Sequence, residues 1–108
     1  MSAAIHPSAQ LDAARVGVGV RVGPLAMVGA GAVLEDGCVV SAAACIGDGA
    51  IIGVGAAVGE GAVVATGVRV GSGARIGAGA VVTRQVPARA VVQGPEATIV
   101  GYDDAPVH

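Results

Sequence analysis

Aliphatic residues recur at every sixth position along most of this chain, and this repeat limits what the chain can fold into. The first series has twelve consecutive members: Val16, Val22, Val28, Leu34, Val40, Ile46, Ile52, Val58, Val64, Val70, Ile76 and Val82. A second series of mostly small residues follows four positions later: Val20, Ala26, Ala32, Cys38, Ala44, Ala50, Ala56, Ala62, Val68, Ala74, Ala80 and Val86. Neither an α-helix nor a long plain strand has a period of six. We therefore expect both series to point inward from short strands that tight turns connect.

Glycines mark where these turns fall. Of the 19 glycines, eight stand one residue after a first-series aliphatic and nine stand three residues after one. Glycine at such recurring places is typical of corners that need a positive φ or a close approach of two backbones. Three hexads then close a triangular coil, and successive coils stack at about 4.8 Å with parallel strand pairing. The predicted fold class is all-β, a parallel β-helix of about five triangular coils.

The charge pattern excludes two kinds of partner. Six Lys and Arg stand against eight Asp and Glu, so a net charge of -2 leaves no basic surface for nucleic acid or an anionic membrane. Glycine or charge interrupts every apolar stretch before the roughly 18 residues that a membrane span needs. Two cysteines, Cys38 and Cys45, and a start without a secretory signal pattern indicate a reducing, cytoplasmic location.

A family resemblance rests on the central run VGAGAVLEDGCVVSAAACIGDGAIIGVGAAVGEGAVVATGVRVGSGARIGAGAVV. This run is similar to the hexapeptide-repeat acyltransferases, as are the opening IHPSA and the closing GAVVTRQVPARAVVQGPEATIVGY. The resemblance implies left-handed coils. We expect the β-helix and its closing segment over residues 1–101, and a polar tail over 102–108. Because only five positions separate Leu11 from Val16, the first coil should be out of phase with the others.

The residue before each first-series aliphatic should point outward, and residues eighteen apart should share a face. This gives three columns: Arg15, Val33, Ile51 and Arg69; Arg21, Val39, Ala57 and Arg75; and Met27, Cys45, Val63 and Val81. The third column is wholly apolar. Contiguous exposed apolar area on a protein surface usually marks an interface. We therefore expect a homo-oligomer that packs through this face, with a monomer as the alternative, and the resemblance implies a trimer.

The resemblance also implies CoA-dependent acyl transfer, with acetyl-CoA as donor and an amino or hydroxyl group of a sugar or nucleotide sugar as acceptor. In similar sugar acetyltransferases the catalytic base is a histidine on a coil corner, and here Ala42 stands in its place. His6 is expected to cap the first coil, and His108 ends the chain. Two histidines so placed do not make the three-histidine zinc site of related carbonic anhydrases, so we expect no metal.

Candidate site residues follow from the same resemblance. The repeat acids are Glu35, Asp36, Asp48 and Glu60, and a carboxylate at a turn is most often a solvated group that hydrogen bonds to nearby backbone. Glu60 is the candidate base, because it follows Ala42 by eighteen residues and should stack beside it. The pantetheine of CoA would run along Gly61, Ala62, Gly79 and Ala80. Its phosphates would lie near Arg84 and Arg89, although an arginine in a polar segment is often only solvated.

A second function of a different class stays open. The chain could be a β-helix without catalytic activity, serving as an assembly module or as a degenerate or engineered relative that lacks the family's base. The uninterrupted repeat favours this alternative, because no inserted loop breaks it between residues 16 and 86.

Overall fold

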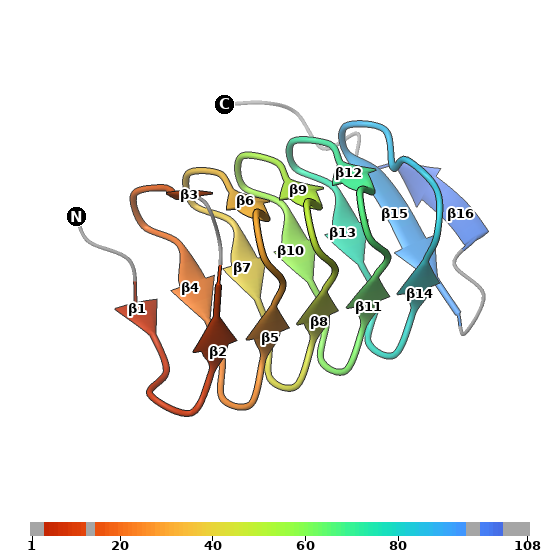
Figure 1. Cartoon of the computed structure of the whole chain (residues 1–108). Helices are drawn as coiled ribbons and strands as arrows, with labels where there is room; N and C mark the ends of the chain where they lie inside the picture. Colours follow the sequence, from red (N-terminus) through yellow and green to blue (C-terminus); the bar gives the residue numbers. More distant parts are fainter. Residues whose placement is uncertain (1–3, 13–14, 95–97, 103–108) are drawn as a thin grey trace.

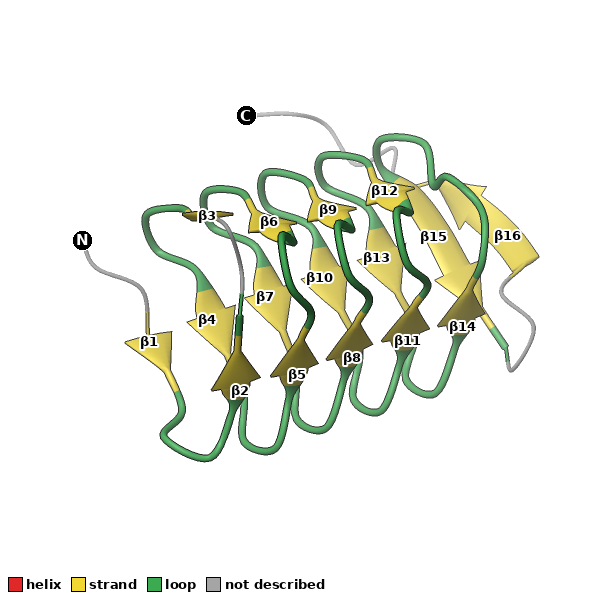
Figure 2. Cartoon of the chain, in the orientation of Figure 1, coloured by secondary structure: helices red, strands yellow, loops and turns green. Residues whose placement is uncertain are grey.

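The computed structural model describes residues 4–12, 15–94 and 98–102, which form a parallel β-helix (Figure 1). Short strands follow one another around a triangular coil, and loops connect them (Figure 2). The described residues contain no helix, and so none that is long and apolar enough to cross a membrane. The polar tail expected over 102–108 lies, apart from Tyr102, outside the described residues.

The strands form three sheets, one on each side of the triangle. Sheet A contains β1 (Ala4–Ile5), β4 (Arg21–Val22), β7 (Val39–Val40), β10 (Ala57–Val58), β13 (Arg75–Ile76), β15 (Ala90–Gln93) and β16 (Thr98–Tyr102). Sheet B contains β2 (Gln10–Leu11), β5 (Met27–Val28), β8 (Cys45–Ile46), β11 (Val63–Val64) and β14 (Val81–Val82). Sheet C contains β3 (Arg15–Val16), β6 (Val33–Leu34), β9 (Ile51–Ile52) and β12 (Arg69–Val70).

Strand register shows where the repeat is regular and where it is not. In the regular coils the paired residues are eighteen apart, as Arg21 and Val39 are in sheet A. The first coil is one residue shorter there, because Ala4 pairs with Arg21, and this confirms the predicted change of phase. At the other end, Val70 pairs with Val86, so the last coil is two residues shorter than the repeat. The three outward columns predicted from the repeat match the three sheets.

The coils are left-handed, as the resemblance implied. In Figure 1 the strands of sheet A run downward at the back and those of sheet B run upward at the front, while the coils advance from left to right. Parallel strands are usually connected with the opposite hand. Strand β16 closes the last coil by pairing antiparallel with β15.

Both inward series form the core, as predicted. First-series residues from Val22 to Val82 are at most 3% exposed, and second-series residues from Val20 to Val86 are at most 6% exposed. Val16, in the first coil, is half-buried against them. No polar or charged side chain is buried in the described part of the chain. Aliphatic packing and backbone hydrogen bonds between coils therefore hold the structure together.

Where a corner carries two glycines, the two serve different purposes. A Cβ on Gly53, the first residue of its corner, would lie 2.7 Å from the backbone nitrogen of Ser72 in the next coil. Gly55, the third residue, has open space around it but a φ of 69°. Side chains are therefore excluded at the first position by the neighbouring backbone, and are disfavoured at the third by the left-handed conformation.

This difference predicts unequal costs for two alanine substitutions in one corner. Gly55→Ala should lower the free energy of unfolding by about 1 kcal/mol, the strain of an alanine in a left-handed conformation. Gly53→Ala should lower it by about 3 kcal/mol, because the coils must move apart. Urea denaturation at one fixed protein concentration measures both variants. Equal losses would contradict the assignment of close coil contact to the first position.

Candidate functional site

The corner that joins sheet A to sheet B carries the residues singled out for catalysis. We call it the A–B corner, and it comprises residues 6–9, 23–26, 41–44, 59–62 and 77–80. The Gly61 N–H donates to the Ala42 carbonyl at 3.0 Å, and the Gly79 N–H donates to the Glu60 carbonyl at 2.8 Å. Glu60 thus lies one coil along from Ala42, as predicted. Its exposed carboxylate has no hydrogen-bond partner within the described ranges.

The backbone of the A–B corner leaves some polar groups open. Gly61 and Gly79 are exposed, and their carbonyls accept no hydrogen bond from any described residue. Ala62 and Ala80 differ from them, because both are fully buried. Their N–H groups donate to carbonyls of the same corner, and their carbonyls accept from sheet B. Two glycine carbonyls are thus available to a ligand here, whereas the two alanines support them from beneath.

A groove of about 600 Å³ lies on sheet A beside this corner. Its lining brings together four polar side chains from different coils: His6, Arg21, Ser41 and Glu60. Ala42 also lines it, at the place where the family resemblance expects a histidine. The floor is apolar. The groove therefore combines a base, hydrogen-bond donors and a cation along one side of the A–B corner.

His6 has a structural role at the first turn of this corner. Its Nδ1 atom accepts hydrogen bonds from the Ser8 N–H at 3.1 Å and from the Ser8 hydroxyl at 2.8 Å. The Ser8 hydroxyl in turn accepts from the Leu25 N–H at 3.0 Å in the next coil. With two donors directed at Nδ1, the proton of the neutral ring is on Nε2. His6 thus helps to cap the first coil, as expected, and its Nε2 atom is a hydrogen-bond donor.

Two other repeat acids have backbone partners. The Asp36 carboxylate accepts from the Val18 N–H at 2.9 Å, and the Asp48 carboxylate accepts from the Ala30 N–H at 2.9 Å. Each bond joins a corner to the coil before it. These two acids behave as the turn carboxylates expected from the sequence, which leaves Glu60 as the unengaged acid of the A–B corner.

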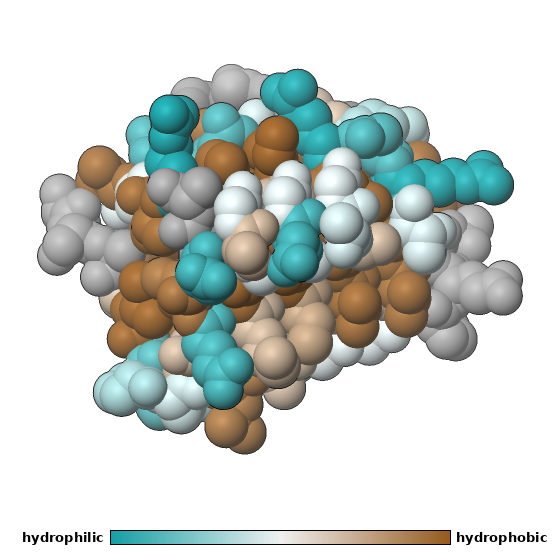
Figure 3. All heavy atoms as spheres, in the orientation of Figure 1, coloured by the Kyte–Doolittle hydropathy of each residue, from teal (hydrophilic) through white to brown (hydrophobic). Residues whose placement is uncertain are grey.

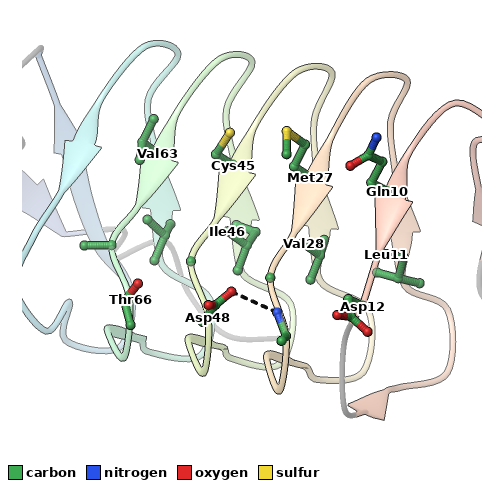
Figure 4. Close-up of a pocket in the computed structure, with 15 residues that line it drawn as sticks. Gln10, Leu11, Asp12, Met27, Val28, Cys45, Ile46, Asp48, Val63 and Thr66 are labelled. Carbon is green, nitrogen blue, oxygen red and sulfur yellow. Dashed lines mark hydrogen bonds between the residues drawn. The ribbon is translucent and has the colours of Figure 1, made fainter.

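Sheet B presents the apolar surface predicted for an interface. Figure 3 shows a hydrophobic band over β5, β8, β11 and β14, with hydrophilic side chains along its upper edge. Met27 is 50% exposed, Val63 36% and Val81 39%, while Cys45 is half-buried between its neighbours. A groove of about 750 Å³ follows this face, and Asp48 lies on its edge (Figure 4).

The two arginines expected near CoA phosphates lie on other corners. Arg84 is exposed and follows β14, where sheet B leads toward the last strand position of sheet C. Arg89 is half-buried just before β15, with a positive φ of 64°, and its N–H donates to the Ser72 carbonyl at 2.9 Å. On one chain, therefore, Glu60 and Arg84 stand at opposite edges of sheet B.

Within the described residues, neither a group of metal ligands nor the buried thiol of Cys38 contributes to the site. Among the residues with described positions, no three His, Cys, Asp and Glu side chains group closely enough to hold a metal ion. Cys38 is a free, fully buried thiol on the core side of its corner. Burial raises its pKa from 9.0 to about 11, with a smaller upward contribution from the Glu35 carboxylate and an opposing backbone hydrogen bond. Cys38 is therefore a core residue.

The fold and the corner define a left-handed parallel β-helix with hexapeptide repeats. No protein-family model and no curated protein sequence matches the chain. Among solved structures, the acetyltransferase domain of PglB from Neisseria gonorrhoeae, in complex with acetyl coenzyme A, is 31% identical with a TM-score of 0.64. The match covers 91% of this chain and 57% of that one.

Two further structures extend the comparison. A histidine-to-alanine mutant of GDP-perosamine N-acetyltransferase from Caulobacter crescentus, in complex with CoA and GDP-perosamine, is 30% identical with a TM-score of 0.54. The match covers 93% of this chain and 54% of that one. Serine acetyltransferase from Neisseria gonorrhoeae is 28% identical with a TM-score of 0.80, over 96% of this chain and 42% of that one.

These matches confirm the resemblance drawn from the sequence. The chain has the fold of the hexapeptide-repeat acyltransferases and is similar to them in sequence over most of its length. It spans about half the length of these relatives, between 42% and 57%.

The sequence did not reveal that Arg21 and Ser41 share a groove with Glu60. Arg21 was recognised only as the end of an outward column. The repeat itself places Ser41 at the first position of the A–B corner, next to the strand that pairs with Arg21. This strand register could have indicated from the sequence that Arg21 and Ser41 lie on adjacent coils.

Cys38 predicts a pH dependence of stability. Between pH 9 and pH 11 the thiol ionises in the unfolded chain but stays protonated in the folded one, so the folded state loses stability as the pH rises. Between pH 8 and pH 10.5 the loss should be about 2 kcal/mol. Cys38→Ala places there the residue that most equivalent positions carry, and it should remove this part of the pH dependence. Urea denaturation at pH 8 and pH 10.5 gives the free energy of unfolding of the wild type and of Cys38→Ala. An equal loss in both proteins between the two pH values would contradict the burial argument.

Proposed function

We propose that the chain is part of a CoA-dependent acyltransferase that transfers an acetyl group to an amino or hydroxyl group of a sugar or nucleotide sugar. The observation that carries the proposal is the match of more than nine-tenths of the chain to two acetyltransferases solved with CoA or acetyl-CoA. The geometry of the A–B corner supports it, because open backbone carbonyls and an unengaged carboxylate lie together there.

The CoA arm would follow the A–B corner. Its pantetheine contains amide N–H groups, and the carbonyls of Gly61 and Gly79 would accept hydrogen bonds from them. Ala62 and Ala80 would set the shape of the path, because their own backbone groups are already paired. The phosphates would lie near an arginine, with Arg84 ahead of Arg89 as the candidate.

Glu60 would act as the general base. An attacking amine or hydroxyl must lose a proton as it adds to the thioester carbonyl, and a carboxylate beside it can take that proton. Glu60 is exposed on the corner that also carries Ala42, one coil away. A carboxylate would thus replace the imidazole that similar enzymes place on this corner.

We further propose that the site is completed by a second copy of the chain, in a homo-oligomer and specifically a trimer. The apolar column Met27, Cys45, Val63 and Val81 would form the interface. Glu60 and Arg84 lie at opposite edges of that same sheet, so Arg84 of a neighbouring copy is better placed than the chain's own to approach the corner of Glu60. The free thiols fit the proposed cytoplasmic location.

A non-catalytic assembly module is the second candidate. One observation favours it: Ala42 lines the groove where the family would have its histidine, and tight turns rather than an inserted loop surround it. Acetyl-CoA binding separates the two candidates, because an assembly module needs no such ligand.

The catalytic proposal predicts saturable binding of acetyl-CoA, measured as a rise in melting temperature. Glu60→Gln should leave that rise unchanged, but it should slow CoA release with a panel of amino sugars and nucleotide-linked amino sugars at least about a hundredfold. Asp36→Asn is the matched control, because its carboxylate lies on another corner. A melting temperature that does not respond to millimolar acetyl-CoA would leave the assembly module as the function.

The interface proposal predicts protection of Cys45. In the oligomer its thiol should react slowly with a disulfide reagent, and the rate should rise on dilution. Val63→Arg, at the neighbouring position in the next coil, should disrupt the interface and expose Cys45, while the buried Cys38 stays unreactive in both proteins. Thiol titration with size-exclusion chromatography measures this. A monomeric wild-type protein with freely reactive Cys45 would overturn the interface.

A further inference from the structure

The groove on sheet A has a cationic end that the proposed acyl transfer does not yet use. Arg21 lies on β4 and lines this groove together with His6 from the coil before and Ser41 from the coil after. At about 600 Å³ the groove is within the size range of small-molecule sites. It lies on a different sheet from the apolar column that we assign to the interface, so an oligomer formed through sheet B leaves it open.

Arg21 is an unneutralised charge in this groove. Its guanidinium is exposed and makes no ion pair or hydrogen bond with the rest of the described chain. The one carboxylate that lines the same groove is Glu60. A guanidinium with no partner and a planar set of donors is suited to bind a phosphate or carboxylate group in a bidentate manner.

Two neutral donors also line the groove, His6 at the end with Arg21 and Ser41 in the coil between Arg21 and Glu60. The hydrogen bonds from Ser8 to Nδ1 of His6 place the ring proton on Nε2, which leaves that atom as a donor. The Ser41 hydroxyl is half-buried and has no hydrogen bond to any residue in the described ranges. A cation and an imidazole N–H thus line one end of the groove, and the carboxylate of Glu60 lines the other, while the Ser41 hydroxyl lies in the coil between them.

The spacing of the two ends limits the ligand. Strand β4 pairs with β7, and β7 pairs with β10, which leads into the corner of Glu60. Two coil steps at about 4.8 Å each separate Arg21 from Glu60 by about 10 Å along the axis. A free amino acid holds its carboxylate only a few bonds from its nucleophile, which is short for this distance. An acceptor with its anionic group at the far end of a sugar spans it better.

We infer that the sheet A groove is the acceptor site and that Arg21 binds the phosphate of a phosphorylated or nucleotide-linked amino sugar. This inference rests on the proposed acyl transfer and specifies its acceptor. The phosphate lies at the end with Arg21 and His6, the Ser41 hydroxyl is within the span of the ligand, and the amino or hydroxyl nucleophile lies beside Glu60. Arg21 is a binding residue here, and it takes no proton.

The test compares Arg21→Gln with the matched control Arg15→Gln. Arg15 is also an exposed arginine at the first position of a two-residue strand, but it lies on sheet C and lines neither the sheet A groove nor the sheet B groove. Melting temperatures are titrated with inorganic phosphate, uridine diphosphate, L-serine and CoA. We expect phosphate and uridine diphosphate to stabilise the wild type and Arg15→Gln. Arg21→Gln should weaken their apparent affinity about tenfold or more, and Arg21→Lys should weaken it less.

The different ligands distinguish a nucleotide-linked acceptor from a sugar phosphate, and they separate phosphate binding from CoA binding. Tighter binding of uridine diphosphate than of phosphate supports a nucleotide-linked acceptor, and equal binding supports a sugar phosphate. The inference is overturned if Arg21→Gln binds phosphate as tightly as the wild type does. It is also overturned if L-serine is the only ligand that stabilises the wild type. Loss of the CoA response in Arg21→Gln also overturns it, because Arg21 would then hold the cofactor. If CoA does not raise the melting temperature while phosphate still binds in an Arg21-dependent manner, the transferase proposal is wrong and the phosphate site is supported.

Discussion

The close contact between successive coils at each corner is the constraint on which the rest of this structure depends. Corner residues lie so near the next coil that a Cβ on Gly53 would meet its backbone, and this proximity lets backbone groups pair from coil to coil. Pairing in turn fixes an eighteen-residue step in the regular coils. The interior is then so narrow that each hexad contributes one aliphatic side chain and one second-series side chain, which is most often alanine. A core without phenylalanine or tryptophan follows from this geometry.

Sequence periodicity predicted the regular coils because one rule governs every residue in them. The inward series, the outward columns and the stacking of Glu60 beside Ala42 all follow from a constant step of eighteen. The rule fails where the step changes. Since the last coil is two residues short, the neighbours of Arg84 and Arg89 cannot be counted forward from the repeat. The groove at Arg21 was missed for another reason, because its lining combines outward strand residues with corner residues from four coils, and the repeat was analysed one column at a time.

Backbone strain at the A–B corner bears on the choice between an enzyme and a bare scaffold. The third corner position is usually glycine with a positive φ, but Leu25 and Ala43 adopt a φ near 60° there on consecutive coils. Leu25 is also 69% exposed, so core packing does not explain it. Residues held in this conformation cost on the order of 1 kcal/mol each and gather at functional sites. Two such residues on this corner favour the proposed catalytic function, whereas Gly61 and Gly79 occupy the third position of later turns on the same corner.

We assign ligand binding to sheet A and association between copies of the chain to sheet B. Sheet B is apolar along its whole middle, whereas sheet A carries a groove with charge at both ends. The A–B corner lies between them, so a ligand on that corner would contact the proposed acceptor groove on one side and the proposed interface on the other. If Arg84 serves the site only from a neighbouring copy, then association and cofactor binding stabilise each other, because each completes contacts for the other. A monomer would then keep its fold and its phosphate groove, but it would no longer bind the cofactor.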